Sequence, residues 1–347
     1  MKDIAAACHV SVAAVSIVLS GNVKKGRISE AKKQEILDTA RKLNYYPNSA
    51  ASNLAKGSSR TVGIVINDIR NSHIAEIDTS ISRKLQEKGF SVSIYLLDEQ
   101  KEKDPQELIR QLASRNLCAL VWAKSYEPQA EAANRRFREV IDALGIPVIT
   151  MDIYDFRSEG VNICFDYEMA GYDAVRYLIE CGHRRIGVIS GIPTYQVTMD
   201  RLKGCRRAHE EAGLNFEPEL IFEGDYTMES GSRALSYLMG QHVTAIFAMN
   251  DEMAFGVYRS ARIYGIRIPG DLSVIGCDNV PFDEVLEVPL TTVGVPAREM
   301  GNFIGEQVCR AVEEHPEDMK NDGINPRRTI YYKPNLYVRG SVRKIEV

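Results

Sequence analysis

The sequence predicts an α/β protein in two parts: an all-α, helix-turn-helix headpiece at the N-terminus, and a larger part made of two lobes of doubly wound parallel sheet. Three observations support this prediction. Short helical patterns fill the first 46 residues, the hydrophobic periodicity changes after residue 59, and a chain of 347 residues suits a small domain plus two lobes better than one core.

The headpiece is predicted from three helical patterns, which span residues 2–8, 12–19 and 30–43. Ser11 and Ser29 precede the second and third patterns, and each hydroxyl can accept a hydrogen bond from a free amide of the following turn. Asn44 can adopt the left-handed conformation that ends a helix. Only two residues separate the first two patterns, so the segment forms a helix-turn-helix module with a supporting third helix.

A linker, residues 47–59, follows the headpiece, residues 1–46. Pro47 blocks continuation of the third helix, and Asn48 can cap a further short segment. This segment is too short to be a stable helix on its own. A Gly-Ser-Ser sequence then forms a flexible joint.

After the linker, short apolar runs alternate with amphipathic helices. The runs are TVGIVIND, VSIYLL, ALVWA, PVITMD, RRIGVISG, TAIFAMND and SVIGCD. Continuous apolar strands separated by helices indicate parallel sheets that are covered on both faces. The roughly ten strands exceed one ordinary sheet, so we predict two lobes. Ligands of such sheets bind beyond the carboxyl ends of the strands.

Charge is distributed unevenly along the chain. The net charge is −4, yet residues 1–60 carry ten Lys/Arg and only four Asp/Glu, so the remainder is strongly acidic. A basic headpiece on an acidic body indicates that only the headpiece meets a polyanion such as double-stranded DNA.

Several classes of protein and site are not indicated. No apolar run approaches the ~20 residues of a membrane span, and the N-terminus lacks the layout of a signal peptide, so we expect a cytoplasmic protein without a membrane partner. The seven cysteines are scattered without a CxxC pair, which favours reduced core thiols over a metal site or disulfides. No GxSxG, HExxH, Walker or GxGxxG motif is present, so we expect neither an enzyme nor a bound cofactor.

Polar residues follow directly on several apolar strands and predict a ligand-binding rim. They are Asp68, Asp152, Asn250 with Asp251, and Asp278 with Asn279. Carboxylates and amides at such positions can bind hydroxyl groups. Asp68 and Asp251 are equally well explained as ordinary loop or capping residues.

Other candidate residues are weighed against structural roles. Arg201 lies at the start of a helix, from which its donors can reach a cleft. Three tyrosines follow strand ends, where they can stack on a ring or fill space: Tyr126, Tyr195 and Tyr226. Trp122 lies inside a strand and is assigned to the core, and His183 is assigned to a turn.

Nine motifs are spread over nearly the whole chain. They are KDIA, VSVAAVSIVLSG, LNYYPNSAASNLAKGSSRTVGIVINDI, GHRRIGVISG, DRLKG, AMNDEMAFGVY, PGDLSVIGCDN, LTTVGVP and LYVRGSV. In this order they resemble the LacI/GalR family of bacterial repressors. The resemblance implies a homodimer, a headpiece that reads a pseudo-palindromic operator, a hinge helix that orders on DNA, and a sensor shaped like a periplasmic binding protein.

The resemblance also implies how the chain builds its lobes. Because the chain of such sensors crosses between lobes three times, we expect a first lobe of residues 60–165 plus 296–323. The second lobe is then expected to contain residues 166–295 plus 324–347.

The residue patterns and the resemblance together give two sets of site residues. The effector set is His73, Ile74, Tyr126, Asp152, Arg201, Tyr226, Asn250 and Asp278. The DNA-binding set is Ser11, Val12, Ala13, Ser16, Ile17, Lys25, Arg27, Asn48, Ser49, Leu54 and Lys56. Within the second set the resemblance assigns Leu54 as a wedge in the minor groove at the operator centre.

Two departures from the family change the expected chemistry. The outward residues of the second helix, Val12, Ala13, Ser16 and Ile17, cannot make bidentate hydrogen bonds to bases. We therefore expect specificity to depend on thymine methyl contacts, on the Leu54 wedge and on DNA deformability. In the effector set, His73 and Ile74 replace the family's usual aromatic pair.

These observations predict a ligand-responsive transcriptional regulator, a repressor whose operator affinity changes when a carbohydrate or carbohydrate-derived effector closes the cleft. The alternative within regulation is a co-repressor mechanism, activated by a nucleobase or by a phosphorylated partner protein. A periplasmic-type binding protein is disfavoured by the basic headpiece. A sugar-processing enzyme would show turnover, which a regulator would not.

Overall fold

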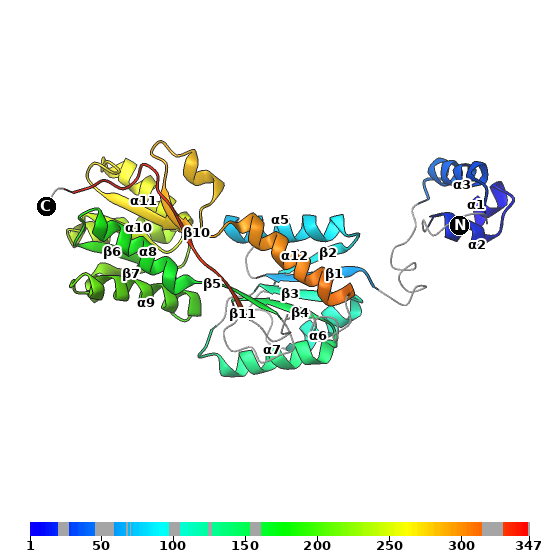
Figure 1. Cartoon of the computed structure of the whole chain (residues 1–347), viewed down its shortest axis with the longest axis horizontal. Helices are drawn as coiled ribbons and strands as arrows, with labels where there is room; N and C mark the ends of the chain where they lie inside the picture. The colour runs from blue at the N-terminus through cyan, green and yellow to red at the C-terminus, as the bar shows by residue number, and fades with distance from the viewer. Residues whose placement is uncertain are drawn as a thin grey trace. The chain divides into compact units, whose positions relative to one another are not determined.

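The computed structural model describes residues 1–19, 28–45, 59–66, 69, 71–96, 105–123, 127–152, 161–313 and 329–345. The chain divides into two compact units, Met1–Arg60 and Thr61–Val347, here called the headpiece and the body. Figure 1 shows the helices and strands of both units. Among the described helices, none is both long and apolar enough to cross a membrane.

Three helices form the headpiece: α1 (Lys2–Ala7), α2 (Val12–Leu19) and α3 (Glu30–Lys42). The predicted helix ends are confirmed. The Ser11 hydroxyl accepts a hydrogen bond from the amide of Ala14 at 3.1 Å, and the Ser29 hydroxyl accepts one from the amide of Lys32 at 3.3 Å. Asn44, just beyond α3, has a φ of 48°. Ile4, Val15, Ile36 and their neighbours fill the small core between the helices.

The first lobe of the body is a parallel sheet between two helical layers. Its strands are β1 (Thr61–Ile66), β2 (Ser91–Leu96), β3 (Ala119–Ala123), β4 (Val148–Met151), β5 (Asn162–Phe165) and β11 (Thr329–Tyr332), in the order β11-β5-β4-β3-β1-β2. Its helices are α5 (Ser72–Glu87), α6 (Pro105–Ser114), α7 (Glu131–Leu144) and α12 (Ala297–Glu313). Helices α5 and α12 cover one face, and α6 and α7 cover the other (Figure 1).

The second lobe repeats this plan. Its strands are β6 (Ile186–Ser190), β7 (Ile221–Glu223), β8 (Ala245–Ala248), β9 (Ser273–Cys277), β10 (Thr291–Gly294) and β12 (Asn335–Tyr337), in the order β12-β10-β9-β8-β6-β7. All pairs are parallel except β10 with β12. Its helices are α8 (Tyr167–Glu180), α9 (Gln196–Glu211), α10 (Met228–Gly240) and α11 (Asp251–Tyr264), with 3-10 turns η1 (Pro218–Leu220) and η2 (Pro281–Glu284). The predicted fold class is confirmed.

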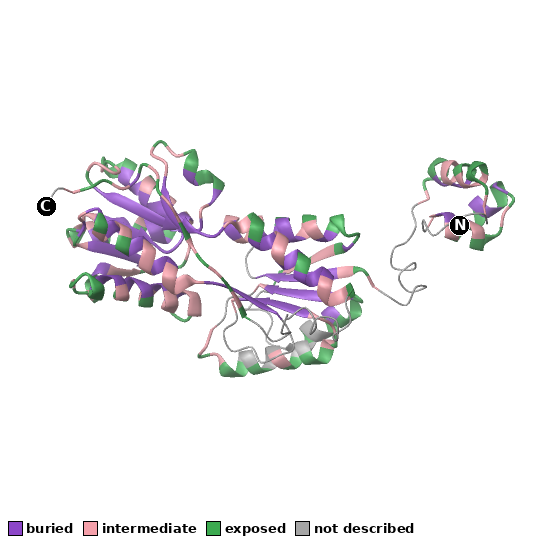
Figure 2. Ribbon diagram, in the orientation of Figure 1, coloured by how far each residue is buried: buried purple, intermediate pink, exposed green. Residues whose placement is uncertain are grey.

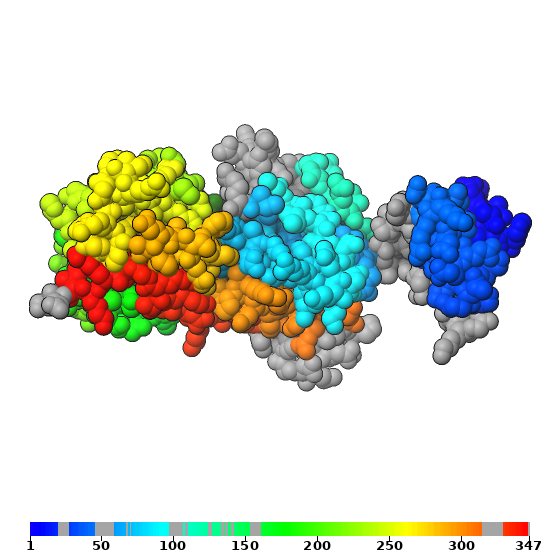
Figure 3. Space-filling model, turned by 90° about the horizontal axis from the view of Figure 1, so that it is seen from above, coloured from blue at the N-terminus to red at the C-terminus, as the bar shows by residue number. Residues whose placement is uncertain are grey.

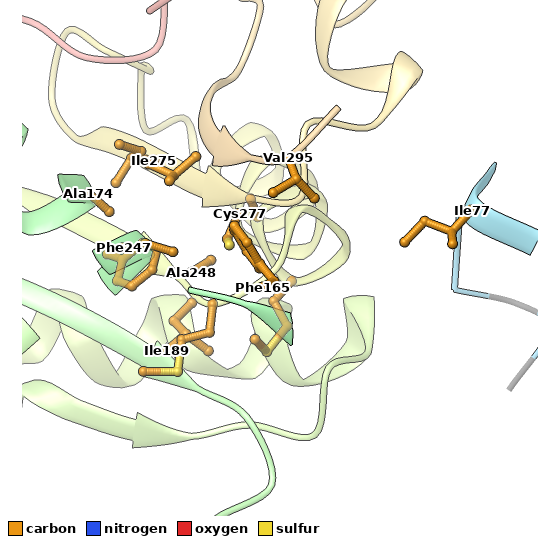
Figure 4. Close-up of a cluster of buried hydrophobic side chains, with 14 of the residues drawn as sticks. Ile77, Phe165, Ala174, Ile189, Phe247, Ala248, Ile275, Cys277 and Val295 are labelled. Carbon is orange, nitrogen blue, oxygen red and sulfur yellow. The ribbon is translucent and has the colours of Figure 1, made fainter. Parts of the chain in front are cut away.

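Burial follows the layers. Figure 2 shows the central strands of both sheets as buried and the outward faces of the helices as exposed. Figure 4 shows part of the core of the second lobe, including Phe247, Ile275 and Cys277. Phe165, the last residue of β5 in the first lobe, belongs to the same buried cluster. Because this cluster contains core residues of both lobes, the first crossing lies where the two cores meet.

One expected boundary is wrong. The sequence places the segment 324–347 in the second lobe, but Thr329–Tyr332 forms β11, which pairs with β5 at the edge of the first sheet. The third crossing lies between β11 and β12, after residue 332. The boundary is hard to see in the sequence because β11 is a short, half-exposed edge strand without the long apolar run of the central strands.

Two structural assignments are confirmed. Trp122 is buried in β3 with 4% of its surface exposed. The ring of His183 is buried in a turn, with Nδ1 2.9 Å from the Thr244 hydroxyl and Nε2 3.1 Å from the Arg343 carbonyl oxygen. Both ring nitrogens of His183 thus have partners, as expected for a structural histidine.

Candidate functional site

A cavity of about 480 Å³ lies between the two lobes, at the carboxyl ends of their strands. Seven residues of the predicted effector set line it: His73, Ile74, Asp152, Arg201, Tyr226, Asn250 and Asp278. Tyr195 also lines the cavity, whereas Tyr126 and Asp68 lie outside the described residues. The fold therefore places around one space residues of both lobes that the sequence assigns to one site.

An ion pair between Arg201 and Asp278 forms the floor of the cavity. The two side chains are almost fully buried, and Arg201 Nη2 lies 3.8 Å from Asp278 Oδ1. Arg201 Nη2 also donates to Cys277 Sγ at 3.6 Å, and the guanidinium carbon lies 4.4 Å from the centre of the Tyr167 ring. Arg201 Nε has no hydrogen-bond partner among the described residues. The guanidinium thus retains a buried donor for which this part of the chain supplies no acceptor.

Burial also acts on the carboxyl group of this pair. Desolvation raises the pKa of Asp278 to about 7, although the nearby Arg201 opposes the shift. A carboxyl group in this state is poised between accepting and donating hydrogen bonds near neutral pH.

Asp152 supports the same floor from the first lobe. Its Oδ1 accepts a hydrogen bond from the Phe165 amide at 2.9 Å, and its Oδ2 accepts one from the Tyr167 hydroxyl at 2.7 Å. Burial raises the pKa of Asp152 to about 6 despite these two donors. The Arg201 guanidinium packs on the face of the Tyr167 ring. By accepting the hydrogen bond of the Tyr167 hydroxyl, Asp152 holds this ring in position.

Asn250 and Tyr226 are joined at the second lobe's side of the cavity. Asn250 is the N-cap of α11, where its Oδ1 accepts from the Met253 amide at 2.9 Å while its Nδ2 donates to the Tyr226 carbonyl oxygen at 3.0 Å. One N–H of the amide group remains for a ligand. The Tyr226 hydroxyl lies 2.6 Å from the Thr198 hydroxyl.

An aromatic wall stands beside these polar groups. The rings of Tyr195 and Tyr226 are stacked, with centroids 6.4 Å apart and planes at 19°. Gly191 lies against the Tyr226 ring, and a Cβ atom at this position would lie only 1.9 Å from its Cζ. The wall therefore needs glycine at 191, and it belongs to the second lobe rather than to the 73/74 position, where the resemblance in the sequence implies an aromatic pair.

His73 and Ile74 lie in the first turn of α5 in the first lobe, where the Asn71 side chain accepts a hydrogen bond from the Ile74 amide at 3.1 Å. Burial lowers the pKa of His73 to about 4, partly opposed by Asp251 and by a main-chain hydrogen bond with Asp278. The imidazole is therefore neutral at physiological pH. This main-chain contact joins the start of α5 in the first lobe to residue 278 of the second lobe.

Three residues that line the cavity have a strained backbone conformation. Asp152, Tyr226 and Asp278 have φ values of 54°, 66° and 134°, which side chains other than glycine rarely adopt. Each such conformation costs on the order of 1–3 kcal/mol and persists only where the surroundings enforce it. The lining residues are thus held in position at a cost in stability, as is typical of binding sites.

Beneath the cavity lies a pair of buried carboxyl groups that the sequence pattern did not reveal. Asp251, which the sequence explains equally well as a capping residue, is fully buried at the start of α11, and Asp283 of η2 is fully buried beside it. Asp251 accepts hydrogen bonds from the Thr292 hydroxyl at 2.7 Å and from the Val280 amide at 3.2 Å. Neither oxygen of Asp283 receives a hydrogen bond from any donor in the described ranges, and Asp251 is its hydrogen-bonding neighbour.

Two adjoining carboxylates cannot both be ionised in a buried site, so one proton must lie between them. Burial and the negative charge of Asp251 raise the pKa of Asp283 to about 10. The cation paired with Asp283 is Arg339, whose Nη1 lies 3.9 Å from Asp283 Oδ2. Asp283 therefore keeps a proton near neutral pH, next to the negative charge of Asp251.

This pair makes stability fall as pH rises. Between the ordinary pKa of 3.8 and the folded value of about 10, Asp283 keeps a proton that the unfolded chain has lost. This one group lowers the free energy of unfolding by up to about 1.4 kcal/mol per pH unit in that range. Asp283→Asn replaces the shared proton with an amide donor, so urea titrations from pH 6 to 9 should show a shallower slope than wild type.

The matched control for this variant is Glu287→Gln, at an exposed position close in sequence, which should keep the wild-type slope. Parallel pH profiles for wild type and Asp283→Asn would contradict the shared proton.

The headpiece presents the predicted face. Val12, Ala13 and Ser16 are exposed on α2 and Ile17 is half-buried, while Val15 and Val18 point into the core. Ser11 caps the helix at its exposed end. The other predicted DNA-binding residues lie outside the described residues: Lys25, Arg27, Asn48, Ser49, Leu54 and Lys56.

Comparisons with known proteins agree with this architecture. Residues 1–48 match the family described as bacterial regulatory proteins, lacI family, and residues 175–342 match the periplasmic binding protein-like domain. The HTH-type transcriptional regulator DegA of Bacillus subtilis (strain 168) is 31% identical over 86% of this chain and 87% of its own length. The chain belongs to the LacI family. The resemblance seen in the sequence is thereby confirmed.

Other LacI-family proteins span the whole chain. The HTH-type transcriptional repressor PurR of Vibrio vulnificus (strain CMCP6) is 28% identical over 99% of both chains. The solved complex of transcriptional regulator CelR with cellobiose has a TM-score of 0.69 and 25% identity, and covers 97% of this chain and 98% of its own. LacI-family members are DNA-binding transcriptional regulators and not enzymes, as the absence of catalytic motifs led us to expect.

Proposed function

We propose that this chain is a homodimeric repressor whose affinity for operator DNA changes when a carbohydrate or carbohydrate-derived effector binds between the two lobes. The observation that carries the proposal is the buried Arg201, whose Nε lacks an acceptor among the described residues while its neighbour Asp278 offers carboxyl oxygens to the same space. A ligand with several hydroxyl groups can satisfy both, because each hydroxyl donates and accepts.

The rest of the cavity supports a carbohydrate. Sugar rings have apolar C–H faces as well as hydroxyl edges, and the stacked Tyr195 and Tyr226 provide an aromatic surface beside the polar floor. Asn250 contributes an N–H on the same side. The similarity to a regulator solved with cellobiose supports the same class of ligand.

The position of the site supports coupling to DNA. Residues of both lobes line the cavity, and His73 of the first lobe contacts the main chain of Asp278 in the second. A ligand that replaces or strengthens this link favours one arrangement of the lobes over another. Any change in operator affinity that results is matched by an equal change in effector affinity, because the two binding free energies are linked.

The first test uses Arg201→Ala and Asp278→Ala. After a thermal-shift screen of sugars, sugar derivatives and nucleobases, calorimetry with the strongest ligand should show each variant losing ~1–3 kcal/mol of binding free energy, because each removes a partner in a desolvated site. Operator binding without effector should change little. Glu287→Gln, exposed and outside the cavity lining, serves as the control. Unchanged affinity in both alanine variants would exclude this cavity as the effector site.

The second test concerns the headpiece. If several phosphates are neutralised per dimer by the basic N-terminal unit, operator affinity should fall by two or more decades between ~50 and 200 mM salt. Fluorescence anisotropy with a labelled operator duplex measures this dependence. An operator affinity that does not change with salt concentration would contradict the proposal that the basic headpiece is the DNA-binding surface.

The third test concerns specificity, for which we propose Leu54 as the main determinant because α2 exposes no side chain capable of bidentate base contacts along its described length. Leu54→Ala should bring operator affinity toward the affinity for scrambled DNA, while the salt dependence and effector affinity stay close to wild type. The measurement is a titration of both duplexes at one salt concentration. A variant that keeps its preference for operator would show that readout lies in α2.

A further inference from the structure

The lining of the effector cavity carries more negative than positive groups. Its ionisable aspartate, glutamate, histidine and arginine residues are Asp152, Asp225, Glu229, Glu252, Asp278, His73 and Arg201. Burial lowers the pKa of His73 to about 4, so this ring is neutral near pH 7. Among the described lining residues Arg201 is therefore the one cation, and it faces five carboxyl groups. A ligand that enters the cavity meets a negative environment.

The positive charge of Arg201 is already shared at the floor of the cavity. Its Nη2 lies 3.8 Å from Asp278 Oδ1. Burial raises the pKa of both Asp152 and Asp278, and in both cases the charge of Arg201 opposes the shift. Arg201 Nε is buried and has no hydrogen-bond partner within the described ranges, so this donor still needs an acceptor. A neutral hydroxyl oxygen satisfies the donor without adding a further negative charge beside the two carboxyl groups.

Three helices that begin at the cavity do not offer free positive ends. Phosphate groups commonly bind where the free amides of a helix N-terminus point at the ligand. At α5, α10 and α11 the side chains of Asn71, Thr227 and Asn250 each accept a hydrogen bond from an amide of the following turn, at 3.1, 3.2 and 2.9 Å. Glu229 and Glu252 add carboxylates to the first turns of α10 and α11. The chain itself thus occupies these ends.

Glu252 is the carboxylate at the cavity that lacks a cation. Asp225 lies 3.7 Å from Arg233 and Glu229 lies 2.9 Å from Arg259, and neither arginine lines the cavity. Glu252 is half-buried and forms no ion pair within the part of the chain that the structure describes. Helix α11 lies at the surface of the second lobe (yellow in Figure 3), and its N-terminal end reaches the cavity through Glu252. The negative charge of Glu252 therefore acts directly on a bound ligand.

We propose that the cavity selects effectors without negative charge, either neutral sugars or amino sugars, and excludes sugar phosphates and sugar acids, with Glu252 as the residue that enforces this choice. The inference rests on the proposed function, because it narrows the class of carbohydrate that the same cavity takes. A phosphate or carboxylate group in the cavity loses its water and meets several carboxyl groups, with one shared guanidinium to offset them. An ammonium group loses water as well, but it gains a carboxylate partner.

The test compares matched sugars that differ in one charged group. Titration calorimetry of the full chain, at one ionic strength, gives dissociation constants for two sets of probes: glucose, glucosamine and glucose 6-phosphate, and galactose, galactosamine and galacturonate. In a set that binds, the anionic member should bind at least tenfold more weakly than the neutral member, and the amino sugar at least as tightly. An anionic member that binds as tightly as its neutral counterpart would overturn the inference while leaving a carbohydrate effector in place. A lack of binding by every probe would contradict the proposed function and the inference together.

Variants of Glu252 test the residue assignment. The readout is the ratio of the dissociation constants of the anionic and the neutral member of one set, which a general loss of stability does not change. Glu252→Gln removes the charge and should lower this ratio at least threefold, and Glu252→Lys should lower it further. Glu210→Gln, exposed on α9 and outside the cavity lining, is the control and should keep the wild-type ratio. Wild-type ratios in both Glu252 variants would show that Glu252 does not set the charge preference.

Discussion

The buried ion pair of Arg201 and Asp278 is the interaction on which the body of this protein depends. Arg201 is only 4% exposed, so its charge must be compensated by neighbouring groups of the protein. The ring of Tyr167 lies under it, Asp152 fixes that ring, and Cys277 accepts one of its hydrogen bonds. The 3.8 Å separation from Asp278 is too long for a direct hydrogen bond, so the compensation is incomplete and leaves room for a ligand.

From this pair, contacts lead toward the crossings between the lobes. The main chain of Asp278 contacts His73 near the start of α5. The negative charge of Asp278 acts on Asp251, and the Asp251 carboxylate accepts a hydrogen bond from the Thr292 hydroxyl on β10. Strand β10 is the last strand before the chain returns to the first lobe as α12, which packs against α5. These contacts place the cavity floor next to the second crossing between the lobes. The shared proton of Asp283 lies within this path, which ties the stability of the second lobe to pH.

Much of this was predictable from local patterns, because helix caps, strand periodicity and residues at strand ends are local properties. As predicted, Ser11 and Ser29 cap the starts of their helices, and Asn44 follows the end of α3. The strand-end residues Asp152, Asn250 and Asp278 line one cavity. Features that arise from distant segments were not predictable. Asp251 and Asp283 belong to separate elements, α11 and η2. The Tyr195–Tyr226 wall depends on glycine at 191, and β11 is too short and too exposed to show a strand pattern.

The central claim is that occupancy of the cleft changes affinity for DNA. The most direct measurement is a fluorescence-anisotropy titration of an operator duplex with the full chain, at one salt concentration, with and without a saturating carbohydrate that stabilises the protein. We predict that the carbohydrate changes the operator dissociation constant at least tenfold, a coupling of about 1.4 kcal/mol, in line with other allosteric proteins. An identical dissociation constant with and without each stabilising carbohydrate would contradict the account.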